Sequence, residues 1–310
     1  MTLYQLEVFL AVVQTGSFTR AGEHLHASQS GVSHNIGDLE KELGIILFTR
    51  NRNGVKLTDA GEQILAHVSE IVHHSKQINQ IAAASRGVSN GTIRIGAFAS
   101  FSAHVLPAIS QAFLHHYPGV ELLLFEGSYA EIEAWIKTGT VDLGFLADSS
   151  HDGFDVVHLL SDPYVAVLPA NHPLKEHDII SIEQLTQEPF LSLKSGCERL
   201  VISAFQKKGL SLNKQFEVAE NSTIITMVEA GIGVSIVPSM ILPAIPGNIV
   251  VKPLSPPIIR EIGLVKLSLQ SDSPVVSAFI KEALKQTSSF RYPASMENSL
   301  ALKYSRFLRL

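Results

Sequence analysis

Three short helical segments with abrupt ends, followed by a strand, a turn and a strand, dominate the start of this 310-residue chain. Thr15-Gly16-Ser17 ends the first segment. Ser28 can cap the third segment, which ends at Gly44. Strand-forming residues on both sides of Asn51-Arg52-Asn53-Gly54 predict a hairpin. This order predicts a winged helix-turn-helix over residues 1–58.

The third helix has the side chains that a DNA-reading helix needs. One face is apolar, and the opposite face carries small or hydrogen-bonding residues that can approach base edges closely. Gln29 suits adenine, and His34 suits guanine or a phosphate, whereas cations on the hairpin suit phosphates or the minor groove. Taken alone, this helix face is equally typical of an ordinary solvated surface, but the helix order and the basic hairpin favour DNA binding. The predicted DNA-contacting residues are Gln29, Ser30, Ser33, His34, Gly37, Arg50, Arg52 and Lys56.

Charge and composition narrow the function classes. The net charge is −5, and residues 1–90 carry seven Lys/Arg against eight Asp/Glu, so no broad basic surface is expected there. Hydrophobic residues make up 45% of the chain, which indicates a folded protein. The N-terminal stretch carries Glu7 and no early basic cluster, so it does not resemble an export signal. With a single cysteine and no apolar run of about 18 residues, the chain is expected to be cytoplasmic, with no membrane segment.

A long helical stretch follows the hairpin, from residue 59 to about 85. Apolar and small residues recur along it at alternating spacings of four and three, which is typical of a coiled-coil seam. The alternative is a helix that packs on its own domain; we favour dimerisation because the helix stands between two domains. The predicted seam consists of Ile64, Val68, Ile71, Ser75, Ile78 and Ala82. We therefore expect a linker and dimerisation helix over 59–90, with a polar break at its end.

The chain then changes to alternating strands and helices. This order predicts an α/β domain over 91–287, with a mainly parallel sheet covered by helices on both faces. Its length suggests two lobes joined by two strand crossings: lobe I at about 91–162 and 265–287, and lobe II at about 163–264. Residues 288–310 are expected to form a C-terminal tail, to which the sequence assigns no role.

The N-terminal region resembles the LysR-type transcriptional regulators. Many positions at fixed spacing carry the resemblance: Ala21, Leu25, Ser28-Gln29, Val32-Ser33, Ile36, Leu39-Glu40, Leu43-Gly44, Leu47-Phe48, Arg50, Leu57-Thr58 and Ala60-Gly61. The resemblance extends to about residue 287, and it implies a homodimer through the linker helix, commonly a tetramer. It also implies an effector domain like a type 2 periplasmic binding protein. Ser30 stands where the family usually has proline and His34 where arginine is common, which can alter the preferred operator bases.

An effector site is expected between the two lobes. In two-lobed α/β domains, ligands lie at strand ends against helix N-termini, and hydroxyl and backbone N–H groups there suit a small anion. The segment after the first strand supplies Phe98, Ser100, Phe101 and Ser102. The family resemblance adds Ser128, Leu146, Ser195, Gly196 and Thr223. The alternative for Ser100 and Ser102 is that they only cap the following helix.

Other functions are less consistent with the sequence. Cys197, near a predicted helix start and Arg199, could be a thiol sensor, but a packed thiol fits as well. The adjacent pairs His73-His74 and His115-His116 make poor chelates, so no metal or other cofactor is expected. No catalytic grouping emerges, which disfavours an enzyme, and the winged helix disfavours a solute-binding protein. The expected partners are double-stranded operator DNA, a small-molecule effector and, as a further candidate, RNA polymerase.

Overall fold

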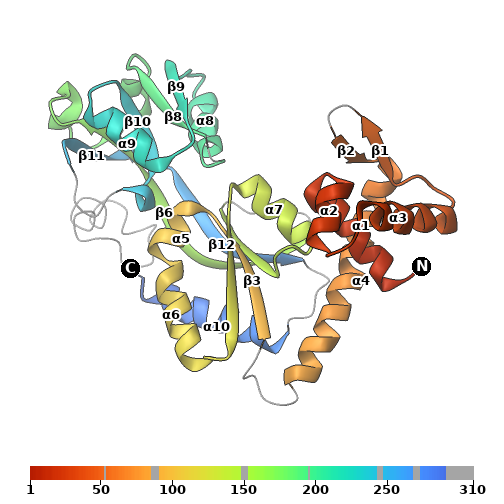
Figure 1. Ribbon diagram of the computed structural model, residues 1–310. Coiled ribbons are helices and arrows are strands. Elements are labelled where there is room, and N and C mark those ends of the chain that lie inside the picture. The colour runs from red at the N-terminus through yellow and green to blue at the C-terminus, as the bar shows by residue number, and fades with distance from the viewer. Residues whose placement is uncertain are drawn as a thin grey trace.

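The computed structural model describes residues 1–51, 54–84, 91–147, 153–194, 196–242, 247–267 and 273–290 (Figure 1). Its N-terminal part is a helix-turn-helix followed by an antiparallel hairpin, as predicted. The elements are α1 (Leu3–Thr15), α2 (Phe18–His24), α3 (Gln29–Leu43), β1 (Phe48–Asn51) and β2 (Gly54–Leu57).

Local capping sets the helix ends in this part. The hydroxyls of Ser17 and Ser28 accept hydrogen bonds from the first turns of α2 and α3, and Gly44 ends α3 with a φ of 72°. The predicted apolar stripe of α3 is buried at Val32, Ile36 and Leu39, in one core with α1 and α2. Because caps and stripe are short-range signals, the sequence predicted the bounds of α3 correctly.

The residues of the predicted dimer seam lie on helix α4 (Asp59–Ala84), and they differ in exposure. Val68 is buried, and Ile64 packs beside it, in the core of the helix-turn-helix itself. By contrast, the side chains of Ile71 and Ile78 are 44% and 68% exposed. The side chain of Ala82 and the polar break at 85–90 lie outside the described residues. The first part of α4 thus packs in the core of the helix-turn-helix. The exposed apolar residues of α4, Ile71 and Ile78, follow Val68 along the helix.

The C-terminal part contains two lobes, each with its own hydrophobic cluster. In the first lobe, β3 pairs in parallel with β4 and β5, and in the second, β8 pairs in parallel with β9 and β10. The first lobe contains β3 (Gly91–Ala97), α5 (Ala99–His104), α6 (Leu106–His116), β4 (Val120–Glu126), α7 (Tyr129–Lys137), β5 (Leu143–Ala147) and α10 (Pro274–Ser288). The second contains η1 (Pro173–Glu176), β7 (Ile180–Ser181), η2 (Ile182–Leu185), β8 (Phe190–Leu193), α8 (Glu198–Lys207), β9 (Lys214–Val218), α9 (Asn221–Glu229), β10 (Val234–Pro238), η3 (Ser239–Ile241) and β11 (Ile249–Ser255).

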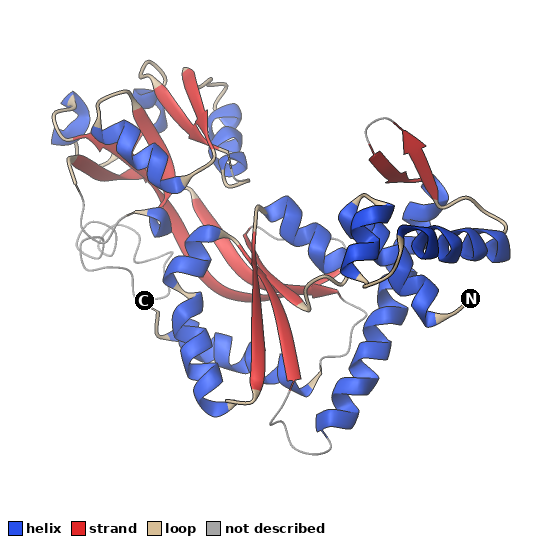
Figure 2. Cartoon of the chain, viewed as in Figure 1, coloured by secondary structure: helices blue, strands red, loops and turns tan. Residues whose placement is uncertain are grey.

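Two long antiparallel strands connect the lobes, as Figure 2 shows. They are β6 (Phe154–Pro169) and β12 (Ile259–Leu267). The first half of β6 pairs with β12, and its second half pairs with β10 and β11. The sequence predicts a strand here only over residues 164–168, because the preceding residues of β6 show no continuous apolar run and range from exposed to buried. β11 was not predicted at all.

The described helices include none that is both long and apolar enough to cross a membrane. Residues 291–310, most of the predicted tail, lie outside the described residues.

Candidate DNA interface and ligand cavity

The N-terminal half of α3 presents a polar surface. Gln29, Ser30, His34 and Gly37 are exposed, and Ser33 is half-buried. The hydroxyl of Ser28, which caps α3, also lies 3.0 Å from the hydroxyl of Ser30. Ser30 is therefore linked to the helix cap, and its hydroxyl lies at the exposed start of α3.

An acidic residue that the sequence prediction missed lies on the same face. Nε2 of His34 is 3.4 Å from Oδ2 of Asp38, and the two side chains are 78% and 51% exposed. The spacing of four residues on a helix could have revealed this pair. Gly37, between them, has open space around its Cα, so neighbouring groups can approach the backbone closely at that point.

The hairpin supplies the basic part of the surface. Lys56 is exposed on β2, where it pairs with Thr49. Arg50 lies in β1 opposite Val55, but its side chain is not described, and Arg52 lies outside the described residues. The backbone N–H of Val55 donates to the carbonyl of Gly16 at 3.4 Å, which joins the hairpin to the turn before α2. The hairpin and α3 therefore belong to one packed unit.

A cavity of about 300 Å³ lies where the two lobes meet. The first lobe contributes Phe98, Ser100, Ser128 and Tyr129, and the second contributes Lys194, Cys197 and Asn221. Arg260, from the crossing strand β12, completes the wall. Three of the predicted effector residues, Phe98, Ser100 and Ser128, line this cavity.

Arg260 is the centre of a buried polar network at the cavity. Its side chain is 2% exposed and forms an ion pair with Asp162, which is 0% exposed and lies opposite on β6. Nε and Nη2 of Arg260 lie 2.8 and 2.7 Å from Oδ2 of Asp162, and Nη1 donates to the Tyr129 hydroxyl at 2.8 Å. Nη2 also donates to Ser100 at 3.1 Å, and the Ser239 hydroxyl donates to Asp162 at 2.6 Å. The network therefore joins both lobes and both crossing strands.

The guanidinium keeps its charge in this buried position. Burial alone lowers the pKa of Arg260, but attraction to the oxygens of Tyr129 and Asp162 outweighs it, so the pKa lies above the ordinary arginine value. The ring of Phe98 lies 4.9 Å from the guanidinium carbon, a further favourable contact. Among the described residues, every N–H of this guanidinium has a partner except one on Nη1.

Glu131 also lines the cavity. Its pKa is lowered, because the backbone N–H of Ser128 and then the Ser128 hydroxyl donate to its carboxylate, at 2.8 and 2.7 Å. This capping box fixes the start of α7, where Tyr129 is the first helical residue.

The other predicted effector residues that the structure describes do not line this cavity. Phe101 is fully buried and stacks on Phe145, and Leu146 lies in the same hydrophobic cluster. Thr223 is exposed on α9, and the buried Ser102 hydroxyl has no partner among the described residues. Gly196 has a φ of 96° and faces the ring of Tyr129, where a Cβ would lie only 3.0 Å away. Ser195 lies outside the described residues.

Arg260 and Tyr129 were missed because their position depends on long-range contacts. Arg260 is buried only because Asp162, far away in sequence, lies opposite it in the register of the crossing strands. A charged residue flanked by isoleucines in Ile258-Ile259-Arg260-Glu261-Ile262 was the available signal. The sequence pattern predicts a strand only over residues 262–267, which leaves this signal out.

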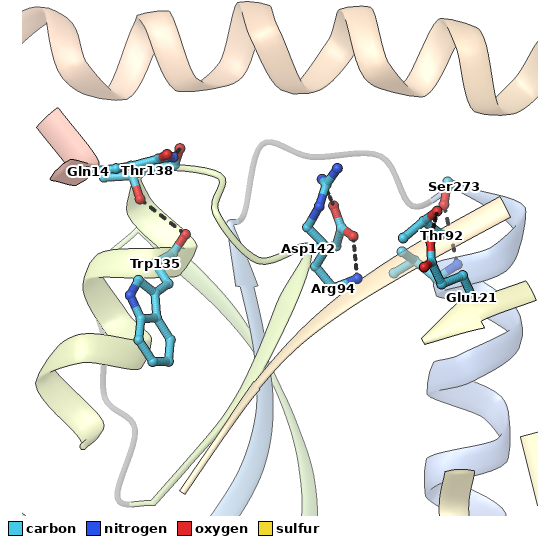
Figure 3. A network of polar contacts seen from close by, with 9 residues as sticks. Gln14, Thr92, Arg94, Glu121, Trp135, Thr138, Asp142 and Ser273 are labelled. Atoms are coloured by element: carbon cyan, nitrogen blue, oxygen red, sulfur yellow. Dashed lines mark hydrogen bonds and ion pairs between the residues drawn. The ribbon is translucent and has the colours of Figure 1, made fainter. Parts of the chain in front are cut away.

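The helix-turn-helix also touches the first lobe (Figure 3). Nε2 of Gln14 in α1 donates to the carbonyl of Thr138, at the C-terminal end of α7, at 3.5 Å. Nearby, Asp142 accepts from the backbone N–H of Arg94 at 2.7 Å. Helix α7 thus reaches from the cavity, at Tyr129, to the helix-turn-helix, at Thr138.

Comparison with known proteins agrees with this architecture. Residues 3–62 match the family described as bacterial regulatory helix-turn-helix protein, lysR family, and residues 86–288 match the LysR substrate binding domain. The uncharacterized HTH-type transcriptional regulator YvbU of Bacillus subtilis is 36% identical, over 91% of this chain and 98% of its own length. The probable HTH-type transcriptional regulator LrrA of Synechococcus elongatus is 32% identical, over 93% and 97%.

Solved structures show the same fold. A full-length OxyR variant from Pseudomonas aeruginosa superposes with a TM-score of 0.73 at 25% identity, covering 93% of this chain and 95% of that one. Full-length CbnR complexed with its target DNA has a TM-score of 0.53 at 21% identity, covering 93% and 100%. The chain therefore belongs to the LysR family and is a DNA-binding transcriptional regulator with a substrate-binding domain for an effector.

Proposed function

We propose that this regulator reads its operator through α3 and the hairpin, and responds to a small ligand with an anionic group in the interlobe cavity. One observation carries the ligand proposal: the cavity wall contains a charged, buried guanidinium with an N–H that no described residue accepts. Hydroxyls of Ser100 and Tyr129 hold that guanidinium in place. A small carboxylate is the group that such a set of donors binds best.

The proposed DNA surface combines base-reading and phosphate-binding residues. Gln29, Ser30, Ser33, His34 and Gly37 lie where α3 would enter the major groove, and Lys56 on the hairpin suits a phosphate. Arg50 and Arg52 remain proposed contacts of the same hairpin. This division between helix and hairpin can be tested by substitution.

His34→Ala is expected to reduce discrimination at one or two operator positions by about 1–3 kcal/mol, because base-edge contacts specify sequence. Lys56→Ala is expected to weaken binding to all sequences and to lower the salt slope by about 1, because it removes one phosphate contact. Fluorescence anisotropy on the DNA upstream of the protein's own gene, with single-base variants, measures both. Equal losses across all base variants for both substitutions would contradict the division.

Ser100→Ala is expected to raise the Kd of a cavity ligand about three- to tenfold, because the variant loses the hydroxyl that holds Nη2 of Arg260. Thermal unfolding with increasing concentrations of small carboxylates, such as propionate, alanine and succinate, measures this Kd. Ser102→Ala is the matched control, since Ser102 lies on the same helix but does not line the cavity. Equal ligand affinity in the two variants would count against the site, and basal DNA binding should remain intact in both.

We also propose that the chain acts in the cytoplasm as a homodimer, and further as a homotetramer, without catalytic activity. The exposed Ile71 and Ile78 of α4 support association through the linker helix. The three hydrophobic clusters support a separate N-terminal part and a two-lobed domain at 91–287. The proposed bounds are 1–58 for the winged helix-turn-helix and 59–90 for the linker helix, whose residues Val68 and Val72 pack in the N-terminal cluster. Contact with RNA polymerase remains a proposal from the family resemblance.

A further inference from the structure

The cavity has opposite electrical character at its inner wall and at its opening. Arg260 is the buried cation of the wall, and its positive charge faces Asp162 behind it. Three glutamates also line the cavity, and all three are exposed: Glu126, Glu131 and Glu220. Lys194 is the exposed cation among the lining residues. We call the exposed lining residues Glu126, Glu131, Glu220 and Lys194 the rim.

Two of the rim carboxylates are available to a ligand. No described residue forms a hydrogen bond or ion pair with the side chain of Glu126 or of Glu220. Glu220 is the N-cap residue of α9, but its side chain makes no capping hydrogen bond. The carboxylate of Glu131, in contrast, accepts hydrogen bonds from the backbone N–H and the hydroxyl of Ser128. Unpaired carboxylates beside a cavity attract a cation and repel a second anionic group.

These charges restrict the kind of anion that fits. A single carboxylate can accept from Arg260 at the inner wall, where the free N–H of Nη1 is buried. A second carboxylate on the same molecule would meet the rim, where glutamates outnumber the single lysine. A volume of about 300 Å³ also restricts the ligand to a small molecule.

We propose that the effector is a small zwitterion, with its carboxylate at Arg260 and its ammonium group at the unpaired carboxylates of Glu126 and Glu220. This inference rests on the proposed ligand function of the cavity. It narrows the class from any small anion to amino-carboxylates. Asn221 also lines the cavity. Its amide can donate a hydrogen bond to a carboxylate and accept one from an ammonium group, so it suits such a ligand.

Matched probes test the charge pattern in the full-length chain. Each amino-carboxylate is paired with the acid that lacks its amino group: alanine with propionate, and γ-aminobutyrate with butyrate; succinate represents dicarboxylates. Kd values come from thermal shift and calorimetry. We expect at least one amino-carboxylate to bind about tenfold or more tightly than its partner acid, because a charge-assisted contact is gained. Succinate is expected to bind more weakly than either.

The double variant Glu126→Gln/Glu220→Gln tests whether the tighter binding of the amino-carboxylate comes from these two glutamates. It is expected to remove the advantage of the amino-carboxylate while leaving the affinity for the matched acid unchanged or improved. Neither glutamate makes a side-chain hydrogen bond in the described part of the chain, so the variant should fold. Glu176→Gln is the control. It also replaces an exposed glutamate by glutamine, but Glu176 lies on the second lobe and does not line the cavity.

The outcomes separate the two proposals. If propionate, butyrate or succinate binds as tightly as the amino-carboxylates, the zwitterion proposal is wrong, and the anion-binding cavity stands. An amino-carboxylate advantage that persists in the double variant also overturns it. If no probe stabilises the chain, both proposals fail.

Discussion

Arg260→Met is expected to lower the free energy of unfolding by about 3–5 kcal/mol, because it leaves a buried charge without its partner. The guanidinium is the only cation that contacts Asp162 among the described residues, and Asp162 is fully buried. After the substitution, Ser239 would be the one described residue whose side chain still donates to this buried carboxylate. Urea unfolding at neutral pH measures the loss.

The double variant Arg260→Met/Asp162→Leu is the control for this result. Removing both charges leaves no unpaired buried ion, so most of the lost stability should return. Ligand binding should not return, because the donor at the cavity wall is gone. A loss below about 1 kcal/mol in the single variant would contradict the assignment of Asp162 as a buried, charged partner.

Gly61→Ala is expected to destabilise the DNA-binding part by about 1–3 kcal/mol and to weaken DNA binding with it. A Cβ at this position would lie 2.5 Å from the Leu47 carbonyl oxygen and 2.8 Å from Cδ2 of Leu57. The carbonyl belongs to the backbone and cannot rotate away, so α4 would have to move off the hairpin. Thermal unfolding and DNA anisotropy measure the two effects.

Gly37→Ala is the matched control, since it also adds one methyl group to a helix of the same domain. No atom lies within 4 Å of the added Cβ, so this variant should gain about 0.5–1 kcal/mol of stability. Its methyl group would stand on the proposed reading face, so DNA affinity should nevertheless fall. If both glycine variants change stability in the same direction, the steric explanation for Gly61 is wrong.

The sequence predicted best the parts that are determined by neighbours along the chain. Helix α3 agrees with its predicted bounds because Ser28, Gly44 and the apolar stripe act within a few residues of each other. The first half of β6 was missed because its partner, β12, follows about 100 residues later, and pairing alone makes it a strand. For the same reason the sequence could not show that Arg260 and Asp162 face each other.

The predicted effector residues include some that line the cavity, but not the ones at its centre, Arg260 and Tyr129. Ser128 caps α7 and Ser100 lies in the first turn of α5, so each closely follows a strand end, and both line the cavity. Leu146 lies in β5, whose residues are all buried, so no alternation in the sequence distinguishes its cavity side from its core side. Phe101 lies on the buried face of the short helix α5 and packs in the hydrophobic cluster of the first lobe. Tyr129 was missed because its role comes from its contact with Arg260.

The position of α7 gives this protein an intrinsic fluorescent reporter. Trp135, the only tryptophan of the chain, lies on α7 between its cavity end at Tyr129 and the Thr138 carbonyl that contacts Gln14. Its ring packs closely over Gly127 and lies 5.9 Å from the ring of Phe125. Because indole emission responds to such contacts, any change in intrinsic tryptophan fluorescence can be assigned to α7 without labelling. Titrations with ligand and with DNA can therefore be followed by the same signal.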